Sequence, residues 1–180
     1  MAEFNSALSH TLTQEGKYSN IPSDPGGETY KGISRKNFPQ WGGWASIDQF
    51  KAQSGFPNNA DASVGLQVLV SQFYEVEFWQ GAYAQIKDQN VAMYLFDCGV
   101  NDGKETSVMI MQQALKFFFS GPIVIDGKFG PKTLEFVNEC DSILLLQEFK
   151  AQWALHYVRD VIAHPEKMIE LHGWLRRVLA

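Results

Sequence analysis

Residues 15–33 read EGKYSNIPSDPGGETYKGI, a stretch rich in glycine, proline and carboxylates. Upstream of it, residues recur at three- and four-residue intervals that predict one face of a helix, namely Phe4, Leu8, and Thr11 or Leu12. Glu15 extends that face, and Gly16 suits the left-handed conformation in which many helices end. The sequence therefore predicts a first helix that ends at Glu15, followed by a small β-hairpin or loop over residues 20–33.

Three side chains in this stretch are suited to chemistry, namely Glu15, Asp24 and Thr29. A carboxyl group at the C-terminal end of a helix meets the negative end of the helix dipole, which disfavours its ionised form. Glycosidic hydrolysis uses one protonated carboxyl group as general acid and a second carboxylate to activate water or to stabilise developing positive charge. Glu15 and Asp24 match these roles. The alternatives are a turn-forming role for Asp24 and a backbone-bonding role for the Thr29 hydroxyl.

The wider pattern resembles the signature of glycoside hydrolase family 108, which comprises phage and bacterial N-acetylmuramidases, some of them known as secretion activators. The matching residues are Glu15-Gly16-x-Tyr18, Asn20, Asp24, Gly26-Gly27, Thr29 and Gly32-Ile33, continuing through Tyr74, Phe78-Trp79, Phe96-Asp97 and Asn101-Asp102-Gly103. The resemblance covers residues 5–178, and its last part is similar to a peptidoglycan-binding segment. Lys17 departs from the family, which usually has a second glycine there. A looser likeness exists to phage-type lysozymes.

The resemblance implies a mainly α-helical, lysozyme-like fold with a minor β-hairpin or loop near the active site. It implies a catalytic part over residues 1–90 and a helical, peptidoglycan-binding-like part over residues 91–180, packed together as one compact unit. The implied activity is that of a peptidoglycan hydrolase, a lysozyme or N-acetylmuramidase that cleaves the β-1,4 bond between N-acetylmuramic acid and N-acetylglucosamine. Glu15 then acts as general acid, while Asp24 and Thr29 position water or stabilise the developing charge.

Further residues are candidate substrate contacts, namely Tyr18, Tyr74, Trp79, Asp97 and Asn101. For the three aromatic side chains the alternative is packing in the core or beneath the loop. The Asn101 amide could bond an N-acetyl group, and the alternative is that Asn101 or Gly103 ends a helix. Helical periodicity itself predicts helices over residues 62–79, 91–100 and 142–163.

Composition excludes several classes of function. The net charge is −5 and the isoelectric point is near 5.3, without a basic run, so nucleic acid is not expected as a partner. No stretch reaches membrane-spanning length, and the N-terminus lacks the pattern of a signal peptide. Cys98 and Cys140 are predicted to be free thiols. Because the histidines show no ligand spacing, neither a metal nor another cofactor is predicted.

The expected partner is therefore the glycan strands of peptidoglycan. The protein is expected to be made in the cytoplasm without a signal peptide and to act in the periplasm or cell wall. Export or lysis by a holin or secretion system would deliver it, as for an endolysin. Two alternatives stay open. One is a lytic transglycosylase, which uses a single acid/base glutamate, and the other is a non-catalytic wall-binding, secretion-assisting protein with an inert site at Glu15.

Overall fold

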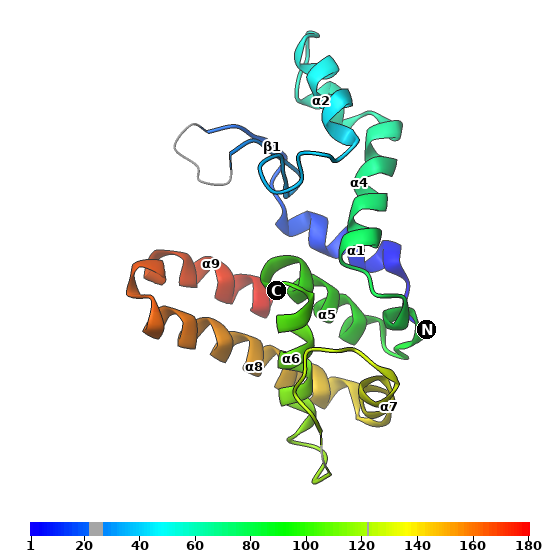
Figure 1. The fold of residues 1–180 in the computed structure, drawn as a ribbon, viewed down its shortest axis with the longest axis vertical. Helices are drawn as coiled ribbons and strands as arrows, with labels where there is room; N and C mark the ends of the chain where they lie inside the picture. The colour runs from blue at the N-terminus through cyan, green and yellow to red at the C-terminus, as the bar shows by residue number, and fades with distance from the viewer. Residues whose placement is uncertain (22–26, 122) are drawn as a thin grey trace. The chain divides into compact units, whose positions relative to one another are not determined.

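The computed structural model describes residues 1–21, 27–121 and 123–180. The chain divides into two compact units, whose segments can be followed by colour in Figure 1. The small unit comprises Leu8–Glu77, and the large unit combines Met1–Ala7 with Phe78–Ala180. The first helix thus contributes to both. The functional partition at residue 90 that the sequence predicts stays a prediction, because a division by compactness does not report function.

The small unit contains most of the first helix, a small sheet and three further helices. Its elements are α1 (Phe4–Gln14), β1 (Tyr18–Ser19), β2 (Thr29–Tyr30), β3 (Ile33–Ser34), α2 (Gly43–Lys51), α3 (Asn58–Asp61) and α4 (Val64–Glu77). The sheet is antiparallel in the order β1-β2-β3. Tyr30 lies opposite Tyr18 on one side and Ile33 on the other. This is the minor β element that the sequence predicts after Glu15.

The turn between β2 and β3 consists of Lys31 and Gly32, both with positive φ, at 46° and 80°. Two consecutive residues of positive φ are what the type I′ hairpin loop requires, and this loop matches the natural twist of paired strands. The Lys31 backbone N–H donates to the carbonyl of Lys17 at 2.8 Å. The turn is therefore tied to the segment that immediately follows Glu15.

The core of the small unit lies between α4 and the sheet. The helix predicted over residues 62–79 is α4, and Leu66, Val70 and Tyr74 are buried at successive four-residue steps along it, whereas Val64, Val68 and Val76 of the same helix are exposed. The other fully buried side chains of this unit include Tyr30, Ile33 and Ile47. Since Tyr30 and Ile33 flank the turn, burial of these two side chains fixes where the turn is placed.

The large unit is helical. Its elements are η1 (Gly81–Gln85), α5 (Gln89–Asp102), α6 (Lys104–Leu115), α7 (Pro131–Glu139), α8 (Ser142–Ala163), η2 (Pro165–Lys167) and α9 (Met168–Leu179), together with the start of α1. The Asp88 and Asp141 carboxylates accept from backbone N–H groups at the starts of α5 and α8 and so cap these helices. After η2, α9 folds back along α8 (Figure 1).

The core of the large unit is formed where α5, α6 and α8 meet, and its fully buried side chains include Leu95, Phe96, Met111, Leu145, Phe149 and Trp153. Both units together confirm a mainly helical fold with one small antiparallel sheet. Among the helices of the described ranges, none has the length and apolarity needed to cross a membrane.

Candidate active site

Glu15 lies one residue beyond α1, and its backbone N–H still donates to the Thr11 carbonyl at 3.2 Å, so it continues the last turn. Its side chain is half-buried. The carboxyl group lies against Gly32 in the β2–β3 turn: a Cβ added there would be 2.5 Å from Glu15 Oε2 and 2.9 Å from its Cδ. The end of the first helix and the hairpin turn thus meet at this carboxyl group.

Tyr74, a residue of α4, also lies next to the β2–β3 turn. Its side chain is 1% exposed, and its hydroxyl donates to the Lys31 carbonyl at 2.7 Å. The same hydroxyl oxygen would be 2.7 Å from a Cβ on Gly32. The Glu15 carboxyl and the Tyr74 hydroxyl therefore converge on one face of Gly32. Only glycine fits there, because a side chain would collide with both groups and because the φ of 80° is unfavourable for other residues.

Thr29 and Asp24 complete the set predicted from sequence. Thr29 lies in the middle strand, half-buried, paired with Ser19 and with Ser34. Asp24 lies outside the described residues. The small sheet thus holds Thr29 in the same unit as Glu15 and Tyr74, while the roles of Thr29 and Asp24 stay predictions.

A polar network anchors β2 to α3 and α4. The Tyr30 hydroxyl donates to Asp61 Oδ1 at 3.0 Å and accepts from Gln67 Nε2 at 3.0 Å. Lys31 Nζ in turn donates to Gln67 Oε1 at 2.6 Å. Burial is the main reason that the pKa of Tyr30 rises to about 12, so the phenol stays protonated and donates. The sequence carries no local signal for this network, which holds β2 and the turn against α3 and α4.

Tyr18 belongs to a second cluster of the small unit. Its hydroxyl donates to Glu28 Oε1 at 3.0 Å, and its ring meets the Phe56 ring edge-on at 4.5 Å between centroids. The Glu28 carboxylate is also paired with Arg35 at 3.2 Å and with Lys51. These contacts are those of a structural residue, and a sugar contact by Tyr18 stays a prediction.

The other candidate substrate contacts lie in the large unit. Trp79 is half-buried and packs against the rings of Phe4, Tyr83 and Phe96. Asp97 has no exposed surface, and Arg177 donates to its two oxygens at 2.8 and 3.0 Å.

Asn101, one turn further along α5, donates to the Tyr157 hydroxyl and accepts from Arg177 at 3.3 Å. The contacts of both Asp97 and Asn101 favour structural roles, and substrate binding by either stays a prediction.

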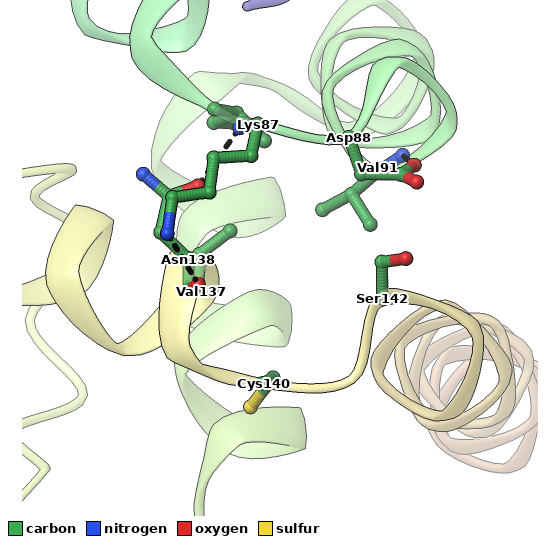
Figure 2. A pocket seen from close by; sticks show the side chains of 8 residues that line it. Lys87, Asp88, Val91, Val137, Asn138, Cys140 and Ser142 are labelled. Carbon is green, nitrogen blue, oxygen red and sulfur yellow. Dashed lines mark hydrogen bonds between the residues drawn. The ribbon is translucent and has the colours of Figure 1, made fainter.

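Cys140 lines a pocket of about 240 Å³ in the large unit, together with Lys87, Asp88 and Ser142 (Figure 2). Burial, followed by the charges of Glu139 and Asp141, raises the pKa of its thiol to about 11. A thiol of that pKa is a poor nucleophile at neutral pH, so the pocket has no evident covalent chemistry. Over the described ranges, no group of three histidine, cysteine or acidic side chains is placed to hold a metal ion.

Comparisons with known proteins identify a family and a shared fold. A family model described as Glycosyl hydrolase 108 matches residues 8–103, which include Glu15, Thr29, Gly32 and Tyr74. A solved structure titled "Structure of Brucella abortus SagA" aligns with a TM-score of 0.60 at 20% sequence identity, covering 98% of this chain and 93% of that one. At this identity the likeness shows a shared fold. No curated protein matches.

Proposed function

Because the chain belongs to glycosyl hydrolase family 108, we propose that it is a peptidoglycan hydrolase of the lysozyme type, with Glu15 as its general acid. Membership of the family makes the chain a glycoside hydrolase. The proposal adds the bond, which is the β-1,4 linkage between N-acetylmuramic acid and N-acetylglucosamine, and the acid that protonates the leaving oxygen.

The observation that carries the proposal is the convergence of Glu15 and Tyr74 on Gly32. A general acid must be held in one orientation and sheltered enough to keep its proton until the glycosidic oxygen arrives. Glu15 is held by the end of α1 and by the turn against which its carboxyl group lies, and its side chain is half-buried. Tyr74, whose hydroxyl is engaged by the Lys31 carbonyl, is a fixed neighbour of the acid.

In this proposal the remaining groups act on the other side of the bond. Asp24 and the Thr29 hydroxyl position the attacking water or stabilise the positive charge that develops on the sugar ring. The substrate is the glycan strand of peptidoglycan, and the protein meets it in the periplasm or wall after delivery by a holin or secretion system. The large unit binds the wall through its peptidoglycan-binding-like segment.

Within that segment, the sequence Asp126-Gly127-Lys128-Phe129-Gly130-Pro131 lies between α6 and the start of α7, and it resembles the turn of peptidoglycan-binding helical repeats. Asp126 accepts from the Lys128 backbone N–H at 2.9 Å and from Gln112 Nε2 at 2.8 Å. Gln112 Oε1 in turn accepts from the backbone N–H groups of Asp126 and Gly127, both at 3.0 Å. These bonds use the polar groups of the turn itself. Oδ1 of Asp126 therefore stabilises the turn.

Mass spectrometry of muropeptides released from purified sacculi tests the proposal. The wild-type protein should release fragments with reducing-end muramic acid. Glu15→Gln, which keeps the shape but removes the transferable proton, should lower the rate by at least about 10²-fold. Glu75→Gln is a matched control, since Glu75 is an exposed carboxylate of α4 and should tolerate the change.

Three outcomes would contradict the proposal. Near-normal release by Glu15→Gln would remove Glu15 from the mechanism. Anhydro-muramic products would indicate a lytic transglycosylase. Binding to sacculi without soluble products, from a folded wild-type protein, would indicate a non-catalytic wall-binding protein.

A further inference from the structure

A groove of about 440 Å³ lies in the small unit between the segment after β3 and the C-terminal half of α4. Its walls combine three aromatic side chains with three polar ones, namely Phe38, Trp41, Phe73, Asn37, Gln40 and Glu77. Apolar walls with a few polar groups are typical of sites that bind small molecules, and the volume lies in the usual range for them.

The aromatic part of the groove is rigid. The Phe38 and Phe73 rings meet edge to face at 4.7 Å between centroids, and Trp41 meets Phe73 at 6.1 Å. The Trp41 indole N–H donates to the Leu69 carbonyl of α4 at 3.3 Å, which fixes the orientation of its ring. A preformed aromatic surface binds a flat apolar face without losing side-chain entropy.

The polar side chains of the groove do not contribute hydrogen bonds to the described part of the fold. Within the described ranges, the side chains of Asn37, Gln40 and Glu77 make no hydrogen bond or ion pair with other protein groups, although Glu77 is half-buried. The two amides supply donors and acceptors, whereas the ionised carboxylate accepts only. The groove therefore suits a ligand that has hydroxyl and N–H donors along with an apolar face.

One pair of aromatic rings in contact connects the groove to the candidate active site. Phe73 lines the groove, and its ring meets that of Tyr74 at 5.5 Å between centroids. The Tyr74 hydroxyl lies with Glu15 over Gly32. A bound group in the groove would thus lie one aromatic ring away from the tyrosine that neighbours the general acid.

We propose that this groove is a glycan subsite that binds a neutral N-acetylhexosamine unit of the substrate strand. The inference rests on the proposed glycosidase function for the identity of the ligand. Pyranose rings present an apolar face to aromatic side chains, and their hydroxyl and acetamido groups match Asn37, Gln40 and Glu77. The Glu77 carboxylate repels anions, so the subsite selects a neutral sugar and not one that carries a free carboxylate.

Binding is measured in the Glu15→Gln background, so that turnover does not consume the ligand. The probe is the β-1,4-linked tetramer of N-acetylglucosamine, titrated by isothermal calorimetry. Adding Glu77→Ala should weaken binding about tenfold, the usual effect of losing hydrogen bonds to a charged acceptor. Adding Gln40→Ala, a change at an exposed side chain, should weaken binding about threefold. Glu75→Ala, on the same helix but outside the groove, is the matched control.

The same substitutions in the otherwise wild-type protein should raise KM for sacculi with kcat nearly unchanged, because a remote subsite holds ground state and transition state alike. Tetramer affinity that is absent, or unaltered by both groove substitutions, would overturn the subsite. Weaker binding in the groove variants combined with no hydrolysis of sacculi by the wild type would overturn the proposed function while the subsite stands.

Discussion

Replacement of Gly32 by alanine should lower the lytic activity of this protein by more than the loss of stability alone explains. The added Cβ would lie 2.5 Å from Glu15 Oε2 and 2.7 Å from the Tyr74 hydroxyl, where real Cβ atoms are essentially never found. Both groups have to move, by at least several tenths of an ångström. Independently of that contact, an alanine at a φ of 80° costs about 1–2 kcal/mol.

Gly32→Ala should lower the catalytic rate in addition to the stability. Displacing a catalytic group by about 1 Å can lower the rate about 10²-fold, which corresponds to about 2.7 kcal/mol of activation free energy. The general acid is one of the two groups that Gly32→Ala displaces. The expected result is a loss of lytic rate of about 10²-fold, with the free energy of unfolding reduced by about 1–3 kcal/mol.

Gly55→Ala provides the matched control. Gly55 belongs to the same unit and has a φ of 93°, but no atom lies within 4 Å of where its Cβ would be. It should therefore incur the backbone strain alone and keep its activity. Turbidity loss of sacculi gives the rate, and urea unfolding gives the stability. If Gly32→Ala retained activity, or lost no more than Gly55→Ala, the placement of Glu15 against this turn would not matter for catalysis.

Three further predictions concern other contacts. Tyr74→Phe removes the hydrogen bond from the buried Tyr74 hydroxyl to the Lys31 carbonyl, so urea unfolding should report a loss of about 0.5–1.5 kcal/mol, and kcat on sacculi should fall with little change in KM. Arg177→Met removes the ion pair of the buried Asp97 carboxylate and should cost about 3–5 kcal/mol by the same assay, whereas an unchanged midpoint would refute the ion pair. Cys140, with a pKa near 11, should react with iodoacetamide at pH 8 about 10²-fold more slowly than an unperturbed thiol, and faster as pH rises towards 11.

Local signals explain why much of the fold could be predicted from the sequence. The interval 142–163 predicted from periodicity is the observed α8, with the Asp141 cap before it and Pro165 shortly after it. Glu15 and Gly16 likewise indicated the end of α1. In each case the residues that start or stop the element adjoin it in the chain, so no distant contact is needed to recognise them.

The contacts that build the site could not be predicted in this way. Glu15, Gly32 and Tyr74 come from a helix end, a hairpin turn and a second helix, and their convergence depends on how α4 packs on the sheet. The sequence marked Gly32 only as part of a family pattern. The physical reason for a glycine at this position is that the Glu15 carboxyl and the Tyr74 hydroxyl occupy the space where a side chain would lie. This reason can be recognised only from the structure, in which the three segments lie together.

The Asn101-Asp102-Gly103 motif shows the same limit in the large unit. The sequence left two readings of Asn101, a contact to an N-acetyl group or a helix end. The helix end is made by Gly103, whose φ is 90° and whose N–H donates to the Gly99 carbonyl at 3.1 Å.

Asn101 and Asp102 instead use their side chains to join helices. Asp102 Oδ2 accepts from Trp153 at 2.6 Å and from Tyr157 at 2.8 Å, and Asn101 contacts both Tyr157 and Arg177. These bonds join α5 to α8 and α9, in segments more than fifty residues apart. Asp102 is half-buried, and the partners of its carboxylate are distant in sequence. The side chains of Asn101 and Asp102 therefore have structural contacts that the turn motif alone does not indicate, while substrate binding by Asn101 stays a prediction.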